Sequence, residues 1–150
     1  MRIVAASLFI LALTAGPALA TDVVFTGVVS DTCTLAVPTP GIMKLSTDGK
    51  TLGSDQLLGV PATATVVSLG GNTVTLSAPV LTDWPGGYAG GETVEMKYSG
   101  LASRPSYSSA PATIPLGILP LTDLIIDMQV SNPAVFLQGT YKAKTVLTCS

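Results

Sequence analysis

The sequence predicts an all-β protein, an antiparallel β-sandwich of about seven or eight short strands. Three observations lead to this prediction. Segments rich in β-branched residues, several with alternating apolar and polar positions, follow one another along the chain. Clusters of Gly, Pro, Asn and Asp separate these segments, as turns separate the strands of a sandwich. No convincing helical repeat of apolar residues is found after residue 20.

The first 20 residues have the three parts of a cleaved secretory signal peptide. Met1 and Arg2 form a short positive start, Ile3–Leu13 is an apolar run, and residues 18–20 (Ala-Leu-Ala) form a small-residue cleavage site. The apolar run is too short to cross a bilayer and no second long run follows, so we expect no transmembrane span after cleavage. We therefore expect an exported protein of the periplasm, the cell surface or the extracellular space, in which residues 21–150 form a single domain.

The composition excludes several classes of function. Charged residues make up only 11% of the chain, and the basic ones are scattered. Because a phosphate backbone requires a dense basic patch, the sequence argues against nucleic-acid binding. The chain contains no histidine, which is the commonest general base and metal ligand. We expect a protein that is not an enzyme, with no catalytic residues, no metal site and no cofactor.

The N-terminal part of the domain contains three strand-like segments. Val23–Val29 is apolar and β-branched, and Cys33–Val37 continues it in the same phase. Residues 38–41 (Pro-Thr-Pro-Gly) should end this strand. Ile42–Leu45 is a short strand candidate, and residues 46–49 are predicted to form a turn in which Gly49 has a positive φ.

The middle of the chain contains the clearest hairpin signal. Thr51–Pro61 is ambiguous between a loop and a short helical turn. Thr63–Leu69 and Thr73–Leu81 are β-branched runs joined by residues 70–72 (Gly-Gly-Asn). A glycine-rich three-residue connection between such runs predicts a β-hairpin.

The next segments alternate between strand and loop. Asp83–Gly91 is rich in Gly and Pro and must be a loop, whereas Thr93–Tyr98 alternates as a strand. Gly100–Pro111 is small and polar, which predicts a mobile loop. Ile114–Leu121 contains prolines that forbid a long helix or a central strand. In Leu124–Val130 every second residue, beginning with Leu124, is expected to face the core.

The two cysteines, Cys33 and Cys149, are expected to form a disulfide. An exported protein folds where thiols are oxidised, which favours a disulfide over a zinc site, and a redox pair would show a close C-x-x-C spacing. The last predicted strand runs over Thr140–Cys149, so the disulfide would place the first and last strands side by side.

Tyr141 has two interpretations. Residues 139–141 (Gly-Thr-Tyr) precede a late strand, as in the tyrosine corner of Ig-like sandwiches, where the hydroxyl binds the backbone. The alternative is an ordinary half-buried tyrosine.

The best candidate for a binding feature is the loop that carries Asp83, Trp84 and Tyr88. It holds the only tryptophan of the chain on a glycine-rich segment, where recognition residues are often found. Its aromatic rings could stack on a sugar or anchor a partner. The alternative, which we favour at this stage, is that Trp84 covers the end of the core.

Two terminal motifs resemble a known family. Residues 24–35 (VFTGVVSDTCTL) resemble the opening of chaperone–usher pilins and of spore-coat-U-like secreted domains, and residues 139–148 resemble their closing strand. The resemblance implies an incomplete, pilin-like Ig-like sandwich whose groove is filled by a strand from a neighbour. Val23, Phe25 and Val29 would lie in or beside the first strand, and Cys33 would be the disulfide cysteine.

The chain departs from this family in two ways. Only Thr21 and Asp22 precede Val23 after the expected cleavage site, which is too short an extension to fill a groove. The second cysteine is at the C-terminus instead of mid-chain. Both departures indicate a self-complete domain, or a fibre in which the segment Val23–Val29 is itself the exchanged strand.

The leading hypothesis is a non-catalytic exported structural protein, a pilin-like or surface-fibre subunit that assembles with itself or binds a periplasmic chaperone. The alternative hypothesis is a monomeric extracellular or periplasmic binding module that uses the Trp84/Tyr88 loop.

Overall fold

The computed structural model describes residues 32–117 and 119–150. The expected signal peptide and the candidate strand-exchange residues Val23, Phe25 and Val29 lie outside these residues. All regular elements in the described ranges are strands with antiparallel pairing, which confirms the all-β class. In these ranges the structure contains no helix of the length and hydropathy needed to cross a membrane.

The described ranges contain twelve strands, more than the seven or eight expected. In chain order they are β1 (Thr32–Thr39), β2 (Lys44–Leu45), β3 (Thr51–Gly53), β4 (Ala62–Leu69), β5 (Thr73–Leu76), β6 (Val80–Asp83), β7 (Thr93–Gly100), β8 (Arg104–Ser108), β9 (Ala112–Pro115), β10 (Leu119–Ser131), β11 (Lys142–Lys144) and β12 (Leu147–Cys149).

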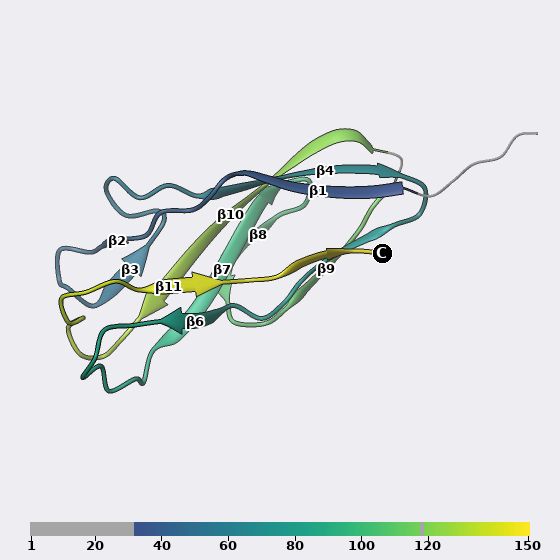
Figure 1. The fold of residues 1–150 in the computed structure, drawn as a ribbon. Coiled ribbons are helices and arrows are strands. Elements are labelled where there is room, and N and C mark those ends of the chain that lie inside the picture. The colour runs from purple at the N-terminus through teal and green to yellow at the C-terminus, as the bar shows by residue number, and fades with distance from the viewer. Residues whose placement is uncertain (1–31, 118) are drawn as a thin grey trace, which may run out of the picture.

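The first layer is a seven-stranded sheet built around β10. Along one side of this long strand lies β7, followed by β8. Along its other side lie first β4, followed by β1, and then β3, followed by β2. In Figure 1, β10 and β7 cross the molecule diagonally, while β1 and β4 run along its upper edge.

The second layer consists of two small sheets, with strand orders β9-β5-β12 and β11-β6. Because β6 follows β5 and β11 precedes β12, the two small sheets continue one another along the molecule. Figure 1 shows β11 beside β6, with the C-terminal end of the chain near the beginning of β1. β1 and β12 therefore meet at one end of the molecule.

The core lies between the two layers and confirms the sandwich. Its buried side chains come from β4, β7 and β10 on one side and from β5 and β9 on the other. They are Ala64, Val66, Val74, Leu76, Met96, Tyr98, Ala112, Ile114, Leu116, Leu124 and Ile126. The alternation predicted for residues 124–130 is confirmed at Leu124, Ile126 and Val130, which are all buried. The turn with a positive φ at Gly49 is also confirmed.

The predicted hairpin between Thr63–Leu69 and Thr73–Leu81 is wrong. β4 and β5 belong to different layers and do not pair with each other. The Asn72 side chain donates hydrogen bonds to the Thr32 carbonyl and the Ser68 hydroxyl, and the backbone carbonyl of Asn72 accepts one from the Leu116 amide. These bonds fix residues 70–72 as a crossover from one layer to the other. Two strands that each bury one face can pack face to face in different layers as well as pair in one sheet, so the local pattern does not decide between the two.

Other boundaries also differ from the predictions. Gly100–Pro111 is not a loop throughout, because it contains β8. The Arg104 guanidinium donates hydrogen bonds to the carbonyls of Ala110 and Pro111, at the end of this segment. The final strand is interrupted between β11 and β12, where the Ser77 hydroxyl accepts a hydrogen bond from the Val146 amide. Thr51–Pro61 contains β3 followed by turns, and β1 continues past Pro38 to Thr39.

Candidate functional site

The predicted disulfide between Cys33 and Cys149 is confirmed, with a Cα–Cα distance of 5.9 Å. It joins β1 to β12, which are outermost strands of different sheets. The first and last strands therefore meet as predicted, but across the two layers and not as neighbours in one sheet. The disulfide closes the edge of the sandwich at this end of the molecule, which we call the disulfide end.

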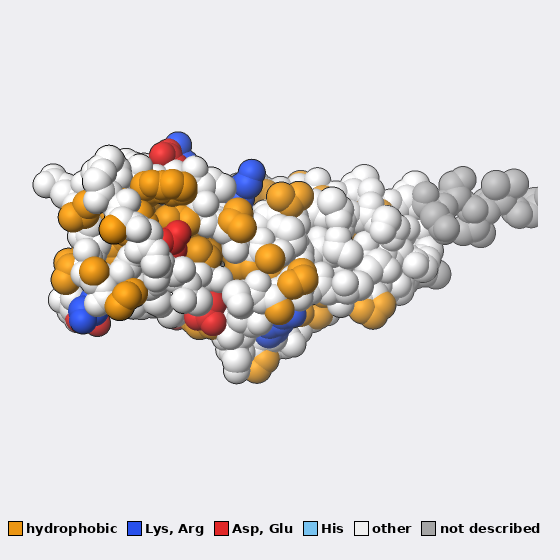
Figure 2. All heavy atoms as spheres, turned by 90° about the horizontal axis from the view of Figure 1, so that it is seen from below, with side chains coloured by type: hydrophobic (Ala, Val, Ile, Leu, Met, Phe, Trp, Pro, Cys, Tyr) orange, Lys and Arg blue, Asp and Glu red, His pale blue; other side chains and the backbone are white. Residues whose placement is uncertain are grey.

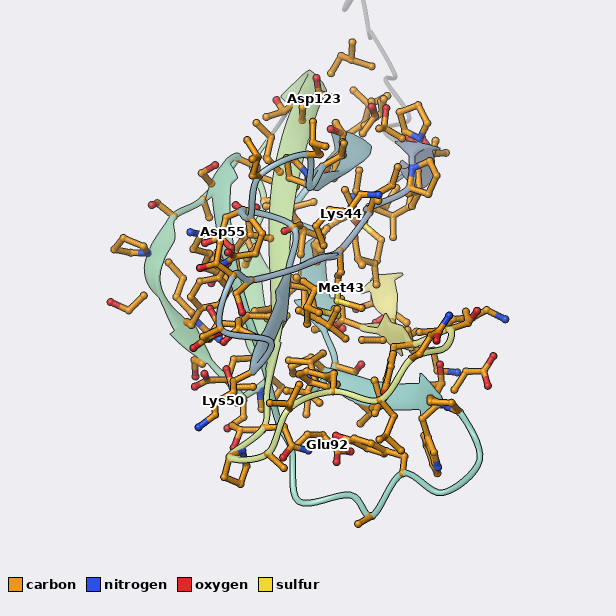
Figure 3. All side chains as sticks on the ribbon, turned by 90° about the vertical axis from the view of Figure 1, so that its left-hand side faces the viewer. Met43, Lys44, Lys50, Asp55, Glu92 and Asp123 are labelled. Carbon is orange, nitrogen blue, oxygen red and sulfur yellow. A yellow bond between two sulfur atoms is a disulfide. The ribbon has the colours of Figure 1, made fainter. Side chains whose placement is uncertain are left out.

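Beyond the disulfide, the same edge of the sandwich opens into a groove of about 580 Å³. One wall is the chain from Gly139 to Leu147, and the other is formed by Val37 and residues 40–43. The end of the groove away from the disulfide, where Pro40 and Gly139 lie, is called the open end. Figure 3 looks onto this end and labels Met43, which lies on the chain that leads into β2 and lines the groove together with residues of β11.

The floor of the groove is part of the hydrophobic interior. It is formed by residues of β3, β4 and β10 and by the residue that follows β3, namely Leu52, Ser54, Ala62, Ala64, Ile126 and Met128. Several of the inward-facing residues around the groove, including Ala143 and Thr145 of its wall, are small. Small side chains on facing strands leave the space between the layers unfilled, which explains why the groove exists.

One wall of the groove is the outer edge of β11. The other begins at the edge of β1 at Val37 and continues through residues 40–43, where Ile42 pairs with Val60. Within the described residues β1 pairs only with β4, and β11 pairs only with β6. A strand edge without a neighbour presents backbone amide and carbonyl groups that can pair with another strand. The groove thus combines a largely apolar floor with the edge of β11 and a short stretch of the edge of β1.

An aromatic cluster supports the open end. Tyr88 stacks on Phe136 at 6.0 Å between ring centroids, and Tyr141 packs edge-on against both rings at 5.4 and 5.0 Å. The buried side chain of Asn132 donates a 2.7 Å hydrogen bond to the Tyr88 hydroxyl, which in turn donates to Glu92. Burial raises the pKa of Tyr88, the Asn132 hydrogen bond opposes this shift, and the Glu92 carboxylate adds to it.

Tyr141 makes the contact expected for a tyrosine corner. Its hydroxyl donates a 3.1 Å hydrogen bond to the Leu137 carbonyl, four residues upstream. This bond fixes the turn that leads into β11. It therefore helps to set the position of one groove wall.

The three residues of the predicted binding loop have different environments. The Asp83 carboxylate forms a 3.0 Å ion pair with Lys142, and Tyr88 belongs to the aromatic cluster. Trp84 is 51% exposed, so the favoured expectation that it covers the core is wrong. The aromatic ring that is buried at this end is Phe136, which packs against Tyr88 and Tyr141.

A cluster of polar side chains lies beside β7. The Lys97 ammonium group is 3.1 Å from the Asp55 carboxylate and 4.5 Å from the centre of the Tyr107 ring. The Tyr107 hydroxyl is buried and has no hydrogen-bond partner among the described residues. Burial raises its pKa, and the nearby Asp55 carboxylate raises it further.

The two acidic residues of β10 accept hydrogen bonds from different side chains. Asp123 accepts a hydrogen bond from Thr65, and Asp127 accepts one from Ser54, each at 2.8 Å. In residues 32–117 and 119–150 no group of three or more Cys, Asp or Glu side chains is placed to hold a metal ion.

Sequence reasoning missed the groove, because its residues come from segments far apart in the chain. One signal was present. The inward-facing positions of the predicted last strand include Ala143 and Thr145, which are too small to fill the centre of a sandwich.

In comparisons with known proteins, no family model, curated protein or solved structure matches the chain.

Proposed function

We propose that this chain is a non-catalytic, exported structural protein that assembles into a fibre by strand exchange. In this proposal the groove of one subunit accepts the segment Val23–Val29 of a second copy. The observation that carries the proposal is the groove itself, a channel with a largely apolar floor between the edge of β11, which has no further partner in the described residues, and the chain that runs from the edge of β1 to β2. Addition of an extended segment to such edges is a common mode of protein assembly.

The candidate segment fits the groove in length and pattern. Val23–Val29 has apolar side chains at alternate positions, Val23, Phe25 and Val29, which would face the floor together. Seven residues in a strand span about 23 Å. The wall from Gly139 to Leu147 has nine residues, so the segment can lie along most of it.

The disulfide favours a segment from a second copy over the chain's own. A strand inserted between two others needs about 10 Å between its neighbours. At the Cys33–Cys149 bond the Cα atoms are only 5.9 Å apart, so no strand can pass there. The chain's own segment precedes Thr32 in the sequence, and Thr32 lies on the far side of the disulfide from the groove. A segment that enters at the open end comes from another subunit.

A disulfide and a head-to-tail interface between copies are both consistent with a surface fibre. Disulfides persist in oxidising compartments, which supports export. Contacts in which one end of a subunit binds the opposite end of the next copy form open filaments when they do not close into a ring.

An SDS gel of sheared cell-surface protein, unheated beside boiled, tests the proposal. The native chain should give a ladder of oligomers when unheated and a single monomer band when boiled. Phe25→Asp should abolish the ladder, because it places a charge on the apolar floor. Thr26→Asp is the matched control, since adjacent strand residues face opposite sides and Thr26 would point away from the floor. A monomer band alone from the native chain would overturn the proposal.

A monomeric binding module that uses the Trp84/Tyr88 loop is the second candidate, favoured by the exposure of Trp84. The two candidates differ in their oligomeric state. If the native chain is monomeric in every fraction, loss of surface or ligand binding in Trp84→Ala would support the binding module.

A further inference from the structure

We propose that Trp84 is a contact between successive subunits, covered in the fibre by the disulfide end of the next copy. This inference rests on the proposed function and extends it from the exchanged strand to the bodies of the subunits. It assigns a role to the exposed tryptophan, which contributes little to the core of its own subunit.

Trp84 lies beside the open end of the groove. Its two neighbours in the chain both contact groove-lining residues: Asp83 forms the ion pair with Lys142, and Pro85 packs so closely on Gly139 that a Cβ added there would lie 2.5 Å from Pro85. In Figure 1, the connection from β6 to β7 and the segment that precedes β11 lie together at the left end of the molecule. Any body held at the open end therefore comes close to Trp84.

The surface around Trp84 combines an exposed leucine with the Asp83–Lys142 ion pair. Leu137 is 47% exposed, and it belongs to the same end of the molecule, since its carbonyl accepts the hydrogen bond from Tyr141. The charge of Asp83 is neutralised by Lys142. Figure 2 shows more hydrophobic side chains on the half of the surface at this end than on the opposite half. Apolar residues gathered at one end indicate an interaction surface.

The exchanged segment brings the next copy to this surface. Val29 is three residues from Thr32, a span of at most about 11 Å. If Val29 lies at the open end of one subunit, Thr32 of the donor copy lies close by. Thr32 pairs with Leu69 at the disulfide end, where Leu69 and Leu121 are 46% and 66% exposed. The donor copy therefore presents exposed leucines to the surface that carries Trp84.

The direction of the exchanged strand follows from the same geometry. The segment enters with Val29 at the open end and Val23 deeper in the groove, towards the disulfide. β1 runs from the disulfide end to the open end, and β11 runs in the opposite direction. The exchanged strand is then parallel to β1 and antiparallel to β11.

The fluorescence of Trp84 tests this inference directly, because it is the only tryptophan in the chain. The full chain with Phe25→Asp provides a monomer with an open groove. We expect its emission to be quenched readily by acrylamide, both alone and after addition of a synthetic peptide of residues 22–30, since the peptide fills the groove without bringing a second body. In the native fibre, the emission should shift to shorter wavelength and resist quenching.

Two variants of the full chain give a second readout. Trp84→Ala and Leu69→Ser should each leave a ladder on the unheated gel but lower the denaturant concentration at which it dissociates. Ile125→Ala, a partly exposed residue on the outer face of β10, is the control and should have no such effect.

The outcomes separate the two proposals. A fibre in which Trp84 remains as accessible to acrylamide as in the monomer would overturn the subunit contact and leave strand exchange standing. Absence of both fibre and peptide binding would overturn strand exchange, and the subunit contact with it.

Discussion

Cys33 and Cys149 join two edge strands that belong to different sheets. The bond is therefore the covalent connection between the two layers at one end of the sandwich. It also determines where the groove stops, since the groove begins beyond it on β1 and extends no further than Leu147 on β12.

Removal of this disulfide should greatly lower the stability of the fold. The cysteines are 116 residues apart, for which the loop-entropy model gives about 5 kcal/mol. The double variant Cys33→Ala/Cys149→Ala avoids free thiols, and urea denaturation of the reduced and oxidised native chain provides the comparison. A loss of less than about 1 kcal/mol would contradict the role of the bond in holding the layers together.

Tyr88→Phe should destabilise the open end. The substitution removes the hydroxyl that accepts a hydrogen bond from the Asn132 side chain. That buried side-chain amide then keeps two hydrogen bonds: it donates to the Gly90 carbonyl at 3.3 Å, and it accepts from the Ala134 backbone amide. A loss of about 1–3 kcal/mol in the free energy of unfolding is expected for such a partly satisfied buried group. Ser106→Ala, which removes an exposed hydroxyl, is the control and should change stability little. Equal effects of the two variants would contradict this assignment.

Gly100→Ala should be among the most damaging single changes. Gly100 has a φ of +96°, and an added Cβ would collide with the backbone carbonyl of Asp123 on β10. The strain and the displaced strand should cost about 2–4 kcal/mol, measured by thermal or urea unfolding. Gly71→Ala is the matched control, because nothing lies within 4 Å of its added Cβ. A stable Gly100→Ala variant would show that β7 and β10 are not held as closely as described.

Alkaline pH should destabilise the protein through Tyr88 and Tyr107. Their pKa values lie above the ordinary 10.0 in the folded state, chiefly because of burial. As pH rises above 10.0, the unfolded chain loses these protons first, so stability should be constant from neutral pH to about 9 and should fall beyond 10. The measurement is urea denaturation as a function of pH.

Tyr107→Phe separates the contribution of Tyr107 to this alkaline loss of stability from that of Tyr88. Its buried hydroxyl lacks a hydrogen-bond partner in the described part of the chain, so the substitution should leave stability at neutral pH unchanged or raise it. It should also make the alkaline decrease shallower. A clear loss of stability at neutral pH would show that this hydroxyl is paired.

The predictions from sequence succeeded where burial of one face of a strand requires every second residue to be apolar. Leu124, Ile126 and Val130 alternate with more exposed residues because one face of β10 packs on the second layer. The loop at residues 84–91 and the turn at Gly49 also follow from local chemistry, since glycine adopts a positive φ at little cost. The disulfide followed from there being only two cysteines in a chain expected to be exported.

The predictions failed where pairing depends on distant partners. The sequence of β4, residues 70–72 and β5 is locally typical of a hairpin, but each strand pairs with others far away in the chain. β8 was missed for a related reason, since its pairing with β7 fixes a segment of low strand propensity. The groove depends on the absence of large side chains at Ala62, Ala64 and Ala143 together, and a linear sequence does not reveal that these residues lie opposite one another.

A complementation experiment tests the central claim most directly. A full chain with Phe25→Asp has an intact groove and a defective segment, whereas one with Ala143→Asp has an intact segment and a charge in its groove. Thr113→Asp, on the exposed face of β9, is the control and should assemble like the native chain. Native mass spectrometry of each variant alone and of the mixture gives the result. Strand exchange predicts monomers for each variant alone and a one-to-one heterodimer in the mixture. A mixture that contains only monomers, under conditions in which the native chain assembles, would contradict the account.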